Sequence, residues 1–262
     1  MTHQFTCGAG PVRVLASLLL LACAAGTGRA ADLLGVSEDV PPFAYLDNGR
    51  HVGLANELLD RIAAASGLRI QRSIQPWARA LKTVADVPNS VVYVMVRTPT
   101  REPQYRWVGP VDDCDVVVLA LRSSALEFKP HAPEARQLRI GVVKGSPAGR
   151  MVRDAGLPEN GLYQTPGSET STKMLYAGHL DMIAGLALPY QHQAARLGLD
   201  ASQIGVVHTL QKGYGCYFAF NPKVDDKVYS RFAAAFEALR GSGELRQLRE
   251  KSVGLRPAMP AR

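Results

Sequence analysis

The chain has 262 residues, of which 47% are hydrophobic and 20% charged, and its formal net charge at pH 7 is +7. This is a globular composition, long enough for one large domain or two modest domains, each with its own core. Lys and Arg form no run and no aromatic residues interleave with them, so the sequence does not indicate nucleic-acid binding. The histidines are scattered and Cys-x-x-Cys spacing is absent, so no metal site is predicted.

The first 30 residues have the pattern of a secretory signal peptide. Arg13 precedes an apolar run over residues 14–25, and Gly28-Arg29-Ala30 then provides small residues at both positions of a cleavage site. We expect cleavage after Ala30, which removes two arginines and no acid and lowers the net charge from +7 to +5. The alternative is a lipid on Cys23, because Leu20-Leu21-Ala22-Cys23 resembles a lipobox, although Leu21 fits that pattern poorly.

Two cysteines remain after removal of the signal peptide, Cys114 and Cys216. In an oxidising compartment an isolated pair of cysteines usually forms a disulfide. Two buried free thiols are the alternative.

Strands and helices alternate in the first part of the mature chain. Gly67 ends the first predicted helix as a left-handed cap, and Pro76 begins the second helix at a position where its missing N–H is harmless. Trp77 lies on the inner stripe of the second helix, so it serves either the core or a ligand, whereas Arg79 lies off that stripe. The predicted strands are 32–36, 68–74, 91–96 and 114–121, and the predicted helices cover 53–67 and the residues after 76.

A Pro- and charge-rich segment, 127–137, precedes a second series of strands and helices. The predicted strands are 138–144, 180–186, 204–209 and 216–220, and the predicted helices follow Pro147 and cover 167–178, 189–197, 225–240 and 242–252. This alternation favours an α/β fold, and no dinucleotide-binding motif, P-loop or nucleophile elbow indicates a cofactor or a hydrolase. Shifts in composition predict two lobes joined by two crossings. After the signal peptide at 1–30, lobe I covers 31–121 and 211–262, and lobe II covers 122–210.

Two arginines follow the apolar strand that ends at Val96. Arg97 and Arg101 flank a Pro-containing turn, and a guanidinium at the end of a buried strand needs an anionic partner. Either arginine pairs with a neighbouring acid such as Glu102, or the two form an anion-binding corner. In the second lobe, the turn Gly145-Ser146 between a strand and a helix leaves backbone N–H groups for an anion. Both features lie at carboxyl ends of strands, where α/β folds bind ligands, and so predict a cleft for a small anionic solute.

The ordered motifs resemble those of the family 3 bacterial extracellular solute-binding proteins, the polar amino acid receptors of ABC importers. The motifs that carry this resemblance are Val40-Pro41-Pro42-Phe43, Arg-Thr-Pro-x-Arg-Glu at 97–102, Trp-Val-Gly-Pro at 107–110, 141–146 and 178–183. The resemblance implies a two-lobe α/β fold of the periplasmic binding protein-like type II, with a hinge and a ligand trapped between the lobes. It also implies a periplasmic monomer that delivers its ligand to a membrane permease and is not an enzyme.

The resemblance also assigns roles to residues. It implies that Arg101 clamps the ligand carboxylate, that Gly145-Ser146 supports the same group, and that Phe43 and Trp77 stack on the ligand. We also expect ligand contacts from Arg97 and Arg79, which add positive charge, and from Ser168 at the start of a helix.

The sequence departs from the family pattern at the position of the acid that binds a ligand ammonium. This position falls at 185–187, where the residues are neutral. The predicted ligand is therefore a small anionic, carboxylate-bearing molecule, either amino acid-like or an organic acid. The alternatives are an exported dehydratase of the cyclohexadienyl type, for which Glu102 and Glu169 are the nearby candidate acids, and a ligand-sensing subunit.

The two remaining cysteines begin the strands that leave and re-enter the first lobe. These strands are expected to be neighbours near the hinge, so we predict a disulfide between Cys114 and Cys216 that closes a loop of about a hundred residues.

Overall fold

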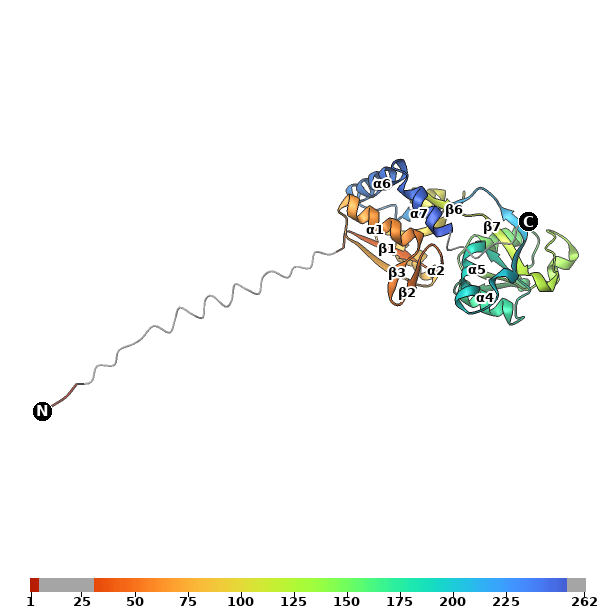
Figure 1. The fold of residues 1–262 in the computed structure, drawn as a ribbon, viewed down its shortest axis with the longest axis horizontal. Coiled ribbons are helices and arrows are strands. Elements are labelled where there is room, and N and C mark those ends of the chain that lie inside the picture. Colours follow the sequence, from red (N-terminus) through yellow and green to blue (C-terminus); the bar gives the residue numbers. More distant parts are fainter. Residues whose placement is uncertain (5–30, 254–262) are drawn as a thin grey trace. The chain divides into compact units, whose positions relative to one another are not determined.

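The computed structural model describes residues 1–4 and 31–253, and residues 31–253 belong to one unit (Figure 1). The predicted signal peptide cleavage site and Cys23 lie outside the described residues. Within the part of the chain that is described, no helix is both long enough and apolar enough to cross a membrane.

The first sheet contains five strands in the order β4-β1-β5-β12-β6. β1 pairs in parallel with β4 and β5, and β12 pairs antiparallel with both β5 and β6. Figure 1 shows α1, α6 and α7 grouped beside this sheet. The elements are β1 (Leu33–Ser37), the hairpin β2 (Tyr45–Asp47) and β3 (Arg50–Val52), α1 (Leu54–Ser66), β4 (Ile70–Ile74), α2 (Trp77–Asp86), β5 (Ser90–Val96), β6 (Arg106–Asp113), β12 (Gly215–Phe220), α6 (Asp226–Gly241) and α7 (Glu244–Val253).

The second sheet also contains five strands, in the order β11-β7-β10-β8-β9. β8 pairs in parallel with β9 and β10, whereas β7 pairs antiparallel with β10 and β11. The elements are β7 (Val116–Leu121), β8 (Ile140–Val143), α3 (Ala148–Asp154), β9 (Leu162–Thr165), α4 (Ser168–Tyr176), β10 (Met182–Gly185), α5 (Ala187–Arg196) and β11 (Ile204–Gln211). Two mixed sheets, each with its own helices, confirm the predicted two-lobe α/β fold.

The chain changes sheet at two places. The first change lies between Asp113 at the end of β6 and Val116 at the start of β7, and the second lies between Gln211 and Gly215. The predicted boundary after Leu121 therefore differs from the first change of sheet. The composition shift at Ser123 marks the end of β7, but sheet membership depends on backbone pairing, and β7 pairs with β10 and β11.

The helix α1 begins and ends at glycines, as the sequence predicts. Gly53 has φ 102°, and a Cβ atom there would lie 2.6 Å from the carbonyl oxygens of Pro42 and Phe43. Gly67 adopts the left-handed conformation that closes the helix. The start of α1 therefore fixes the path of the Pro41–Phe43 turn, which borders the space between the lobes.

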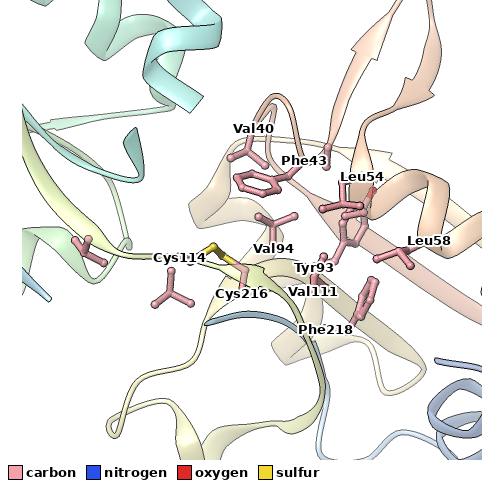
Figure 2. Packing of buried hydrophobic residues seen from close by; sticks show 14 of the residues in the cluster. Val40, Phe43, Leu54, Leu58, Tyr93, Val94, Val111, Cys114, Cys216 and Phe218 are labelled. Atoms are coloured by element: carbon pink, nitrogen blue, oxygen red, sulfur yellow. A yellow bond between two sulfur atoms is a disulfide. The ribbon is translucent and has the colours of Figure 1, made fainter. Parts of the chain in front are cut away.

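Buried aromatic and aliphatic side chains form a core cluster that extends from the first sheet through the crossings into the second sheet, and Figure 2 shows part of it. The figure shows Val40, Phe43 and Val94 lying near the disulfide between Cys114 and Cys216. The two cysteines have a Cα–Cα distance of 5.5 Å, which confirms the predicted bond over the alternative of free thiols. The crossings are also hydrogen-bonded, because the Cys114 N–H donates to the carbonyl of Tyr214 over 2.7 Å.

Candidate functional site

A mainly apolar pocket lies where β1, α2 and β5 of the first lobe face β8, α4 and β10 of the second. Its cavity volume is about 60 Å³, and the hollow is partly open to solvent. The polar side chains on its wall come from Glu38, Arg101, Ser146, Ser168 and Tyr190. The wall is completed by Val40, Trp77, Val94, Val96, Val116, Val143, Pro147, Ala148, Ala184, Gly185, Leu186 and Pro189. A small ligand with a largely apolar body and few charged groups fits such a wall.

Arg101 carries the positive charge of the pocket. Its Nη1 donates to the carbonyl of Val96 over 3.0 Å, and its Nη2 donates to the carbonyl of Gly145 over 2.9 Å. Its guanidinium also lies 5.7 Å from the centre of the Trp77 ring. Burial lowers the pKa of Arg101 to about 10, so the side chain remains charged at pH 7. The two carbonyls orient the guanidinium and leave further N–H groups for a ligand.

The acidic residue on the pocket wall is Glu38. It follows β1 directly, and its Oε2 is buried without a hydrogen-bond partner among the described residues. Burial is the main cause that raises the pKa of Glu38 to about 8, and the neighbouring Asp39 carboxylate raises it further. The Arg101 charge acts in the opposite direction. The Glu38 carboxyl is therefore mostly protonated at pH 7.

Two further pocket residues have polar atoms that are buried without a partner among the residues described. These are Nε1 of Trp77 and Oγ of Ser146, which belong to opposite lobes. A buried donor or acceptor without a partner is unfavourable by about 1–3 kcal/mol, so native proteins rarely keep one. Together with Oε2 of Glu38, these atoms indicate that the pocket is built for polar groups of a ligand.

The Gly145-Ser146 turn was predicted to offer backbone N–H groups to an anion, and the structure shows a different arrangement. The Ser146 N–H already donates to the carbonyl of Val143 over 3.0 Å, and the following helix α3 is only 7 residues long. The Gly145 carbonyl instead accepts the Arg101 hydrogen bond, and its φ of 82° requires glycine. The turn therefore offers the Ser146 hydroxyl to the pocket and positions Arg101.

Residues 33–254 match the family described as bacterial extracellular solute-binding proteins, family 3. The chain belongs to this family. A search of curated proteins gave no match.

Solved structures of solute-binding proteins and of a sensor domain share the fold at low sequence identity. The arginine-, lysine-, histidine-binding protein ArtJ from Geobacillus stearothermophilus is 16% identical at a TM-score of 0.73, covering 86% of this chain and 96% of that one. An amino acid ABC transporter substrate-binding protein from Streptococcus pneumoniae bound to L-arginine is 18% identical at a TM-score of 0.70, covering 85% and 93%. A histidine kinase sensor domain with similarity to periplasmic binding proteins is 19% identical at a TM-score of 0.73, covering 86% and 97%.

Within this family 3 protein, four of the residues predicted to bind ligand line the pocket. They are Arg101, Trp77, Ser146 and Ser168. The Ser168 hydroxyl also donates to the carbonyl of Asp39 over 3.3 Å, so it contacts the other lobe.

Three residues predicted as ligand contacts lie elsewhere. Arg97 pairs with both carboxylate oxygens of Glu102 at 2.5 Å, and its guanidinium lies 5.1 Å from the centre of the Tyr217 ring. The ion pair with Glu102 raises the pKa of Arg97, so the acidic-neighbour interpretation applies to this residue. Arg79 is exposed, and Phe43 is 3% exposed within the core cluster.

Glu38 lines the pocket and was not predicted from the sequence. Its position directly after a buried strand at the centre of a parallel pairing was the available signal, because ligands gather at such strand ends. The neutral Gly185 and Leu186 line the pocket from the second lobe, and Glu38 lines it from the first lobe. Among the described residues, no group of three or more His, Cys, Asp or Glu side chains is placed to hold a metal ion.

Proposed function

We propose that this protein is a periplasmic receptor that traps a small carboxylate-bearing ligand, amino acid-like or an organic acid, between its two lobes and delivers it to an ABC importer. Membership of the solute-binding family supports the receptor role. The single observation that supports the carboxylate is Arg101, whose guanidinium is oriented by carbonyls of both lobes.

The mechanism that we infer is hinge closure. A ligand that contacts Arg101 and Trp77 of the first lobe and Ser146 of the second binds the closed form more tightly than the open form. It therefore shifts the population towards closure. The closed form would then dock on the membrane permease. ArtJ and the S. pneumoniae protein, whose described ligands are amino acids, support a ligand that carries a carboxylate.

Replacing Arg101 tests whether this residue binds a carboxylate of the ligand. We expect Arg101→Ala to weaken binding of small carboxylates by about 10- to 100-fold or more, because a hydrogen bond to a charged group contributes about 1.5–3 kcal/mol. Calorimetric titration measures the affinity, and circular dichroism confirms that the fold is kept. Arg97→Ala is the matched control, since Arg97 pairs with Glu102 outside the pocket. Equal losses in the two variants would contradict the assignment of Arg101.

Closure of the two lobes on a ligand is tested by thermal melting and solution scattering. A carboxylate present at about 100 times its dissociation constant should raise the melting temperature by roughly 5–10 °C. The same ligand should lower the radius of gyration in solution scattering. Saturation without either change would argue against the receptor mechanism.

The dehydratase is a second candidate because Glu38 supplies a protonated carboxyl beside Arg101, which acid catalysis on a cyclic carboxylate needs. An absorbance assay with prephenate and arogenate tests it. Turnover that Glu38→Gln abolishes would favour the enzyme over the receptor.

A further inference from the structure

The central strand of the first sheet, β5, contains a residue with a strained backbone. Val94 has a φ of 63°, which a β-branched residue rarely adopts, because the Cβ atom crowds a backbone carbonyl there. Among the described non-glycine residues with positive φ, it is the only one that lies inside a strand. Val94 is 6% exposed and lines the pocket. Such strain persists only where the surrounding structure enforces it, and it gathers at functional sites.

The backbone of Val94 belongs to a β-bulge. Between its pairings with β12 at Val92 and Met95, β5 has two residues, Tyr93 and Val94, where β12 has one. A bulge of this kind reverses the alternation of side chains along a strand. Tyr93 and Val94 both belong to the core cluster shown in part in Figure 2, whereas Val92 and Met95 belong to the cluster on the α2 side. In a regular strand Val94 would point towards α2 together with Val92, and the bulge turns it to the pocket instead.

A glycine would adopt the backbone conformation of Val94 without strain. The chain does use glycine at other positions of positive φ, such as Gly145 with φ 82° and Gly53 with φ 102°. At Val94 it keeps a β-branched side chain against the preference of the backbone. This indicates a role for the isopropyl group itself.

The isopropyl group of Val94 lies a short distance along β5 from the anchor of Arg101. Val94 precedes Val96 by two residues, and the Val96 carbonyl accepts the hydrogen bond from Nη1 of Arg101 over 3.0 Å. Both valines line the pocket, and two residues of extended chain span about 7 Å. A ligand held at Arg101 therefore reaches Val94 with a short apolar body. In a cavity of about 60 Å³, one isopropyl group on the wall changes the available length substantially.

We propose that Val94 is a specificity residue, whose strained backbone is kept because its side chain closes one end of the pocket and limits the length of the ligand's apolar body. This inference rests on the receptor function proposed above. It concerns the size of the ligand and makes no claim about its charges.

The length limit is measured by calorimetric titration with straight-chain carboxylic acids and straight-chain 2-amino acids of increasing length. We expect the affinity of the wild type to fall beyond a certain chain length. Val94→Ala should move this limit to longer chains, and Val94→Gly should move it further. Each methylene group that becomes buried in the enlarged pocket should tighten binding by about fourfold. Val94→Ala, the milder truncation, carries the test if Val94→Gly fails to fold.

Two further variants separate a steric role in the pocket from a general loss of packing. Val94→Thr keeps the shape of the side chain and should keep the wild-type limit. Val92→Ala is the matched control, because Val92 is buried in the same strand but belongs to the cluster on the α2 side. An unchanged limit in Val94→Ala and Val94→Gly, or an equal shift in Val92→Ala, would overturn the inference while the receptor function stands. If none of the probes binds the wild type, the proposed function fails together with the inference.

The backbone strain has its own signature in thermal melts. At an ordinary strand position alanine stabilises the fold more than glycine does, and we expect this order at Val92. At Val94 the positive φ should reverse the order, so that Val94→Gly melts about 2–4 °C above Val94→Ala. If Val94→Gly melts below Val94→Ala instead, the backbone is not strained and the proposal is overturned.

Discussion

The side chain of Trp77 contacts both the pocket and the core. The face of its indole ring lies against the Arg101 guanidinium, at 5.7 Å from the ring centre, while the side chain packs with Ala80 and Val84 of α2 in the core. Its Nε1 atom has no partner among the described residues. The sequence left open whether Trp77 serves the core or the ligand, and its geometry is compatible with both roles.

Substituting Trp77 by Phe separates these roles. Phe keeps an aromatic face for Arg101 but removes the indole N–H, so we expect ligand affinity to fall by about 2- to 10-fold with only a small change in melting temperature. Titration with the best-binding carboxylate and a thermal melt measure the two effects. A large loss of stability with unchanged affinity would assign Trp77 to the core alone.

At the scale of elements, the crossings between the sheets are joined by the disulfide Cys114–Cys216. The bond closes a chain segment with a sequence separation of 102 residues, and it ties the end of β6 to β12. In the chain-entropy account, a loop of this length contributes about 4–5 kcal/mol by restricting the unfolded chain.

Replacing both cysteines by serine should therefore lower the free energy of unfolding by about 4–5 kcal/mol. Denaturant unfolding of the double variant, compared with the oxidised and the reduced wild type, measures this. The reduced wild type should resemble the double variant. Free thiols in the unreduced, denatured wild type would contradict the bond.

The strands and helices that periodic sequence patterns define were predicted close to their observed bounds. The helix from Gly53 to Gly67 is an example, because a hydrophobic stripe and a glycine cap both mark it. The strand β6 was not predicted, since Gly109-Pro110 interrupts its pattern and is tolerated here at the edge of the sheet. The position of Glu38 in the pocket and the sheet to which β7 belongs both depend on which strands become neighbours. A local sequence pattern does not contain that information.

At the scale of the whole molecule, Asp39 connects the two lobes. Its Oδ1 accepts hydrogen bonds from Nη1 of Arg196 over 2.8 Å and from Nε2 of Gln193 over 3.2 Å, both on α5 of the second lobe. Its backbone carbonyl accepts from Ser168 of α4. Because Asp39 follows Glu38 in the chain, a residue that lines the pocket is adjacent to a residue that joins the two lobes.

We expect Asp39→Ala to favour the open form. Losing a half-exposed ion pair and one further hydrogen bond should shift the balance between closed and open forms by about 1 kcal/mol, or roughly fivefold. The radius of gyration of the ligand-free protein should therefore increase in solution scattering. Arg196→Ala should act in the same direction, and the double variant should show little more than Asp39→Ala alone, because Asp39→Ala already removes the ion pair with Arg196. Asp86→Ala is the control, since Asp86 pairs with Lys82 inside α2 and, among the described residues, forms no ion pair with another element. A radius of gyration that stays at the wild-type value in both Asp39→Ala and Arg196→Ala would show that other contacts hold the lobes closed.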